Sequence, residues 1–280
     1  MMNVVGKYKR KLEELYESKP GARKTVLKII NIYEDALKNY ILPKHKYRKG
    51  EDVFLKKGTF VHGTYKNYDG VDFIIKNGFV SAEFIGGRGG KYPGCVGVWN
   101  IKDDILLNDY INYYSGGTIR YNNFEDDKTE TAIIPYNKMR YINNIIKKSG
   151  YQRWIMEQTK EARFMPSLIQ DVVQVAFIIN TNNKYIKKLL EYDILNSYYN
   201  KNLDAFVLPS YYSSFLEFRD KKDDFFTDRE NAIIFGFPSV FVEGILVGNL
   251  YEKDKGMLDK IKKQMPNVYI CNLKGKVIRV

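Results

Sequence analysis

Apolar side chains spaced three or four residues apart predict two amphipathic helices near the beginning of the chain, over 7–18 and 22–41. Pro20 and Gly21 stand between the two patterns, and Pro43 follows the second one. Because proline and glycine interrupt or end helices, we expect Pro20-Gly21 to separate the two helices and Pro43 to close the second.

Beyond about residue 50 the pattern changes to short apolar runs bounded by glycine or polar residues, which are typical of strands. Strands are predicted at 58–64, 95–99, 131–134, 172–179, 206–208, 232–235, 244–247, 268–270 and 277–278. Helices are predicted at 71–76, 105–114, 139–148, 185–192 and 253–264. This irregular order favours an α+β fold over a βαβ repeat. It also suggests a helical N-terminal segment, 1–50, followed by a mixed body, 51–280.

The composition excludes several classes of protein. With 44% apolar and 28% charged residues, the chain is not disordered throughout, and no apolar run approaches the 18 residues of a transmembrane helix. The N-terminus lacks the apolar core of a secretory signal. Two cysteines and two histidines are too few for a disulfide framework and lack the paired spacing of common zinc sites. We therefore expect a cytoplasmic protein that needs no metal and no membrane.

The net charge of +12 indicates attraction to polyanions such as nucleic acid. A second interpretation is codon bias, because only 11 of the 45 basic residues are Arg, and Tyr, Asn and Ile are abundant, as in AT-rich genomes. The distribution favours a contact surface, since residues 1–50 hold 13 Lys and Arg against 5 Asp and Glu.

Familiar phosphate-binding loops are not present. The run at 21–25 lacks the upstream glycine and the preceding strand of a P-loop. The glycine cluster at 86–90 leads into a predicted strand rather than a helix, so it lacks the helix N-terminus that binds phosphate. We expect the glycine cluster to provide mobility.

Four short motifs nevertheless occur in a characteristic order, each at the edge of a predicted element. They are His62-Gly63-Thr64 at a strand end, Ile74 to Phe79 as a short helix with Gly78, Gly97-Val98-Trp99 at a strand end with Tyr110 on the next helix, and Glu230 before a strand that leads to Pro238 and the run 241–247.

This ordered set resembles the ADP-ribosyltransferase superfamily, on the branch with a His-Tyr-Glu triad that includes poly(ADP-ribose) polymerases and diphtheria-like toxins. The C-terminal run is similar to the end of DarT-type DNA-modifying toxins. The resemblance covers about residues 55–250. It implies a split β-sandwich core with flanking helices and an N-terminal helical segment. It also implies a mono-ADP-ribosyltransferase of bacterial or phage type that uses NAD as its substrate.

The resemblance assigns catalytic roles to Glu230 and His62. Cleavage of the nicotinamide–ribose bond passes through an oxocarbenium-like state, which a carboxylate at Glu230 would stabilise. Glu243, beside Gly244, is the alternative carboxylate. We rank it second, because the family carboxylate precedes the strand that leads to the proline.

The resemblance also assigns NAD-binding roles. Flat aromatic faces at Trp99 and Tyr110 would hold the nicotinamide, with Trp replacing the family's Tyr. The Gly63 backbone would bind the carboxamide, and His62 and Thr64 would hold ribose hydroxyls. Candidates to bind the pyrophosphate are Arg88, Lys91 and Arg120.

The acceptor of ADP-ribose is expected to be nucleic acid, because the N-terminal segment is basic. A protein acceptor is the main alternative. A different class of function is also open, namely a non-catalytic, basic nucleic-acid-binding or phage structural protein. Whether an antitoxin or host factor binds the chain is not indicated by the sequence.

Overall fold

The protein is described here from a computed structural model. The structure describes residues 13–64, 68–85, 92, 94–114, 117–123, 128–134, 164–166, 175–195, 206 and 230–280. The description covers only the backbone for residues 64, 68–69, 111–114, 117–123, 128–134, 164–166 and 249–250.

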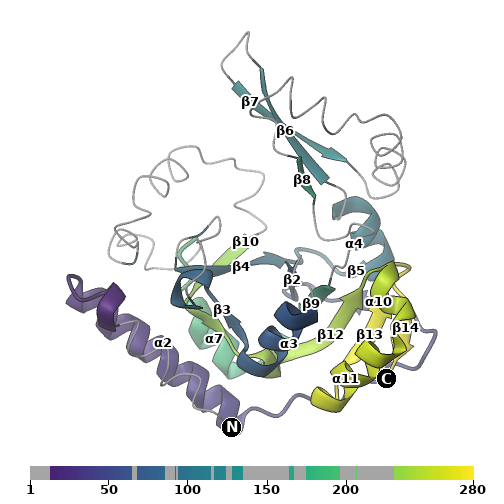
Figure 1. Ribbon diagram of the computed structural model, residues 1–280, viewed down its shortest axis with the longest axis horizontal. Helices are drawn as coiled ribbons and strands as arrows, with labels where there is room; N and C mark the ends of the chain where they lie inside the picture. The colour runs from purple at the N-terminus through teal and green to yellow at the C-terminus, as the bar shows by residue number, and fades with distance from the viewer. Residues whose placement is uncertain are drawn as a thin grey trace.

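A seven-stranded mixed sheet forms the centre of the molecule (Figure 1). Its strands lie in the order β10 (Glu230–Ile234), β4 (Cys95–Asn100), β2 (Phe60–Thr64), β9 (Val175–Ile179), β12 (Val242–Val247), β13 (Tyr269–Asn272) and β14 (Val277–Arg279). Neighbouring strands are antiparallel except β12 and β13, which are parallel. We call this the main sheet.

Three smaller sheets accompany the main sheet. Two of them are two-stranded, and they pair β1 (Phe54–Leu55) with β5 (Ile105–Leu106) and β3 (Phe79–Val80) with β11 (Gly236–Phe237). The third contains β6 (Gly117–Asn123), β7 (Lys128–Ile134) and β8 (Phe164–Pro166), and Figure 1 shows its hairpin projecting away from the main sheet.

One face of the main sheet is covered by helices. Because side chains alternate along a strand, Phe60, Val98, Phe177 and Ile270 share this face, and we call it the helix face. Four helices bury apolar side chains in the same core cluster: α2 (Pro20–Asn39), α3 (Tyr68–Asn77), α7 (Lys184–Leu190) and α11 (Lys255–Gln264).

The opposite face carries Val61, Trp99, Ile178 and Leu246, and it packs into a second, smaller core cluster. Its cover is the connector 44–57, which we call the strap, together with helix α4 (Leu107–Tyr114). We call this the strap face. Backbone hydrogen bonds fix the strap to the C-terminal hairpin, for example from Gly50 N to Val277 O at 2.7 Å.

The predicted helix over 22–41 is confirmed as α2, with one correction. Pro20 and Gly21 do not precede this helix but form its first turn. Proline is well suited to that place, because the first helical residues need no amide donor and its fixed φ already matches a helix. Residues 13–15 are helical, and the rest of the earlier helix lies outside the described residues or in a turn.

Other predicted elements agree closely, and the differences are local. Gly78 ends α3 with φ +81°, the left-handed conformation expected of a glycine cap. The helix predicted over 105–114 begins at Leu107, since Ile105 and Leu106 pair with β1 instead. Phe206 lies in a turn rather than a strand. The predicted helix at 139–148 and the glycine cluster at 86–90 lie outside the described residues.

The structure confirms an α+β fold with a large mixed sheet. Helix α2 packs into the same core as the sheet, so the described part of the N-terminal segment contributes to that core. The boundary near residue 50 stays a prediction. No described helix is both long and apolar enough to cross a membrane.

Candidate functional site

Glu230 and Trp99 face each other across the pair of strands β10 and β4. In the antiparallel register Glu230 lies directly opposite Trp99, so both side chains leave the sheet on the strap face. Directly opposite residues have Cβ atoms about 4.5–5.5 Å apart. Glu230 is only 9% exposed. The strand pairing therefore places a buried carboxylate beside a large aromatic ring.

Trp99 and Tyr110 line the same pocket, which has a volume of about 110 Å³. The other lining residues form the chain between them: Asn100, Ile101, Lys102, Asp103, Asp104 and Ile105. Tyr110 comes from α4 and is almost fully buried. A cavity of about 150 Å³ holds benzene, so this pocket is of the size that takes part of one flat ring.

The main sheet forks beside this pocket. Strands β2 and β4 pair only at Phe60–Asn100 and Val61–Trp99, whereas β2 continues along β9 to its last residue. At the fork the His62 ring reaches β4, and its Nδ1 lies 2.8 Å from the Gly97 carbonyl oxygen. Since a carbonyl can only accept, Nδ1 donates, and in the neutral ring Nε2 is then an acceptor.

The structure does not place every predicted residue on one face. The His62 side chain lies on the helix face, where its ring centroid is 5.1 Å from that of Phe79. It therefore leaves β2 on the side opposite to Trp99 and Glu230, and its ring hydrogen-bonds to the Gly97 carbonyl of β4, the strand that carries Trp99. Gly63 follows on the strap-face side, opposite Ala176 of β9. Thr64 is the last residue of β2.

The alternative carboxylate, Glu243, lies elsewhere in the main sheet. Its strand β12 is separated from β10 by β4, β2 and β9, and the register of β12 shifts between Val242 and Gly244. Burial raises the pKa of Glu243, and a hydrogen bond from Asn180 Nδ2 at 2.9 Å opposes that rise. Glu243 is thus remote from the pair formed by Glu230 and Trp99.

A buried polar chain that the sequence did not reveal fixes β10 in place. Asp193, which is 1% exposed, accepts hydrogen bonds from Ala232 N at 2.9 Å and from the Asn231 side chain. Asn231 Oδ1 in turn accepts from Asn100 Nδ2 on β4 at 3.0 Å. These contacts hold the register that sets Glu230 opposite Trp99. No local pattern marks this role of Asp193, because the two partners that it holds in β10 are almost 40 residues away.

Three predicted cation candidates cannot be placed at the site. Arg88 and Lys91 lie outside the described residues, and Arg120 lies in β6, of which only the backbone is described. Within the described ranges, no group of three or more His, Cys, Asp or Glu side chains could hold a metal ion.

The chain was compared with known proteins in three ways. It matches no family model, no curated protein and no solved structure.

Proposed function

We propose that the protein is an NAD-dependent mono-ADP-ribosyltransferase. The observation that carries the proposal is the position of Glu230 directly opposite Trp99. Trp99 and Tyr110 line one pocket, and Glu230 is not itself one of the lining residues. The fork between β2 and β4, with His62 and Gly63 on one side and Gly97 to Trp99 on the other, supports a split β-sandwich of the ADP-ribosyltransferase kind.

Glu230 has the surroundings that this chemistry needs. When the nicotinamide–ribose bond breaks, its electron pair leaves with the nicotinamide nitrogen, and positive charge develops on the ribose. A nearly buried carboxylate stabilises that charge more strongly than an exposed one, because water screens it less. An acceptor oxygen or nitrogen then bonds to the same ribose carbon and loses its proton.

Trp99 and Tyr110 would hold the nicotinamide ring. They lie at opposite ends of the chain segment that lines the pocket. Their aromatic faces suit a flat leaving group. Trp99 replaces the tyrosine of the family, which preserves a stacking surface but removes a hydroxyl group.

His62 would act from the neighbouring strand. Because Nδ1 donates to the Gly97 carbonyl, the acceptor nitrogen of a neutral His62 is Nε2. The resemblance assigns a ribose hydroxyl to this residue. The same hydrogen bond orients the ring across the fork. The backbone of Gly63 would bind the carboxamide of the nicotinamide.

The proposal is tested by measuring NAD cleavage with Glu230→Gln. Loss of one electrostatic stabiliser of a transition state costs about 10²–10³ in rate, so we expect a loss of that size. The matched control is Glu243→Gln, which removes a carboxylate from β12, a strand that three others separate from β10, and should leave turnover close to wild type. Wild-type activity in the Glu230 variant would overturn the proposal.

A second measurement addresses the non-catalytic alternative. A ligand that binds only the folded state raises the melting temperature, so NAD should stabilise the wild-type protein. If NAD neither stabilises the protein nor is cleaved, the alternative of a basic nucleic-acid-binding protein is favoured. Mass spectrometry of nucleic acid and protein after incubation with labelled NAD would identify the acceptor.

A further inference from the structure

The small ribbon formed by β1 and β5 exposes two large apolar side chains side by side. Phe54 and Leu106 lie directly opposite each other in this ribbon, and they are 39% and 41% exposed. Among the described residues only four large hydrophobic side chains are exposed, and Phe54 and Leu106 are two of them. Their pairing therefore makes a small apolar platform on the surface.

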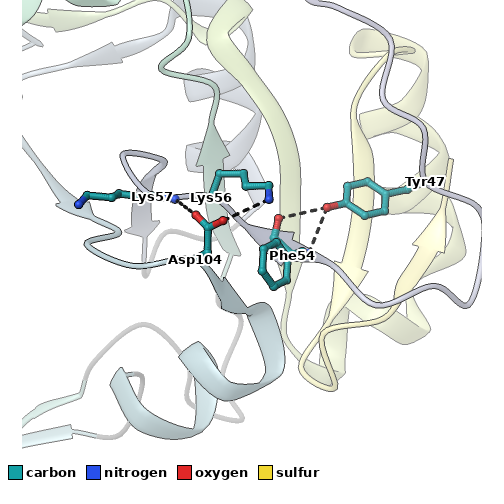
Figure 2. Close-up of polar contacts among 5 residues, drawn as sticks. All are labelled: Tyr47, Phe54, Lys56, Lys57 and Asp104. Atoms are coloured by element: carbon teal, nitrogen blue, oxygen red, sulfur yellow. Dashed lines mark hydrogen bonds and ion pairs between the residues drawn. The ribbon is translucent and has the colours of Figure 1, made fainter.

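Lys56 lies against this platform, and Lys57 follows it in the chain. Lys56 Nζ lies 4.6 Å from the centroid of the Phe54 ring and 3.2 Å from Asp104 Oδ2. The Lys56 side chain is 71% exposed, so its ion pair with Asp104 is a weak one that a phosphate can replace. Lys57 donates its backbone amide to Asp104 at 2.7 Å, while Figure 2 shows its side chain extending away from that contact.

The platform is held in a defined conformation. The Tyr47 hydroxyl accepts from Phe54 N at 3.1 Å and donates to Phe54 O at 3.2 Å (Figure 2). On the other edge, β5 pairs with β1 through Phe54–Leu106 and Leu55–Ile105. Binding to this surface would therefore require little ordering of the backbone.

The ribbon is continuous with the candidate site. Asp104 and Ile105 line the same pocket as Trp99 and Tyr110, and Lys56 and Lys57 are bonded to Asp104. Lys102, also exposed, lines the pocket as well. A chain lying on the ribbon would thus reach the pocket through adjacent residues.

The charge of the strap identifies the kind of partner. The strap carries six exposed basic residues and two exposed acidic ones: Lys44, Lys46, Arg48, Lys49, Lys56 and Lys57 against Glu51 and Asp52. Exposed aromatic rings with lysines around them are the features with which proteins bind single strands, because a ring stacks on a base while cations contact phosphates. A duplex would not fit this surface, since its bases are already stacked on each other.

We propose that the β1–β5 ribbon and the strap bind a single-stranded nucleic acid and guide it to the pocket, with Phe54 stacking on a base and Lys56 and Lys57 contacting phosphates. The part of this inference that makes the strand the acceptor of ADP-ribose rests on the proposed function. The binding itself does not.

Binding is measured without NAD, by fluorescence anisotropy with a labelled single-stranded DNA, the same sequence as RNA, and the DNA duplex. We expect both single strands to bind and the duplex to bind more weakly. Phe54→Ala should weaken single-strand binding roughly tenfold, as removal of one stacking ring does. The double variant Lys56→Gln/Lys57→Gln should lower the slope of log affinity against log salt by about 1.4, since each phosphate contact to a single strand contributes about 0.7.

The matched control is Lys255→Gln/Lys263→Gln, which removes the same charge from exposed positions on α11. It should bind single strands nearly as well as the wild type. If the control weakens binding as much as the ribbon variant, only overall charge matters and the proposal is overturned. Unchanged binding by Phe54→Ala, or equal loss on the duplex, also overturns it.

Two further outcomes separate this inference from the proposed function. Single-strand binding that depends on Phe54 in a protein that never cleaves NAD would support the ribbon and reject the enzyme. If the protein cleaves NAD but the ribbon variants bind single strands as well as the wild type, the enzyme is supported and the ribbon is rejected as the binding surface. Binding to phosphatidylserine vesicles, with the same dependence on Phe54 and no binding to single strands, would replace nucleic acid by a membrane surface and overturn the proposal.

Discussion

The two faces of the main sheet are covered in different ways. On the helix face, α2, α3, α7 and α11 enclose a large cluster of aromatic and aliphatic side chains. On the strap face, a smaller cluster lies under the strap and α4. The candidate site belongs to the strap face, where Glu230, Trp99 and Tyr110 lie.

The helix face mainly stabilises the fold, whereas the strap face carries the candidate site. Hydrophobic stabilisation grows with the apolar area removed from water, so the helix face contributes most of it. The strap face carries polar and aromatic side chains, and two residues associated with it, Trp99 and Tyr110, line a pocket. Substitutions on the two faces would test this division.

The largest effect should come from the centre of the sheet, where Phe177 faces the helices and Ile178 faces the strap. Both side chains are fully buried. Phe177→Ala should lower the free energy of unfolding by about 3–5 kcal/mol and Ile178→Ala by about 2–5 kcal/mol, measured by urea denaturation. If the Phe177→Ala variant is more stable than the Ile178→Ala variant, the helix face does not contribute more to the free energy of unfolding than the strap face.

The next effect tests how one face supports the other. Asp193→Ala removes the acceptor of Ala232 N and of the Asn231 side chain, and should cost about 2–3 kcal/mol. Because the register of β10 sets Glu230 opposite Trp99, NAD turnover should fall even at temperatures where the variant stays folded. Asp254→Ala is the control, since it removes only the cap of α11 and should cost about 1 kcal/mol without loss of turnover.

A smaller effect is expected at the strap. Tyr47→Phe removes the hydroxyl that bonds both Phe54 N and Phe54 O, and should cost about 0.5–1.5 kcal/mol. Hydrogen exchange of the Phe54 amide should become faster, while amides of β9 keep their protection. Faster exchange throughout β9 would show that the strap supports the whole core.

The smallest effect concerns the pH dependence of Glu243. Burial raises the pKa of this carboxyl group in the folded state above its unfolded value, so the folded protein binds the proton more tightly. Its favourable contribution is present at low pH and is lost as the pH rises through the folded pKa. Glu243→Gln should therefore gain stability over the wild type by less than about 1 kcal/mol, above that pKa but not near pH 4. If the Glu243→Gln variant gains most stability at low pH, the pKa of Glu243 is lowered on folding rather than raised, and the prediction is wrong.

Local sequence patterns predicted where helices and strands lie better than they predicted which of these elements contact one another. The spacing of apolar residues located α2, and glycine located the end of α3, because both signals act within one or two turns of chain. Element limits were missed where tertiary contacts decide. Phe235 was predicted inside a strand, but it adopts φ +66° with its backbone bonded to Gly94 and Ser81.

The sequence predicted a set of candidate site residues but not how they are arranged. The motif order identified Trp99, Tyr110 and Glu230, which the structure brings to one face. It did not show that the His62 side chain leaves β2 on the other face, because the side of a strand depends on its register with distant strands. Nor did it reveal Phe54, whose exposure depends on the ribbon with β5.

The anchoring of β10 by Asp193 has a practical consequence for protein engineering. Asp193 joins the two ends of the stretch between Leu195 and Glu230, since it also accepts from Leu195 N at 2.9 Å. One buried carboxylate thus holds two parts of the chain that are far apart in sequence, the turn at Leu195 and the strand that begins at Glu230. Asp193 should therefore be kept unchanged in any library that varies the residues around Glu230.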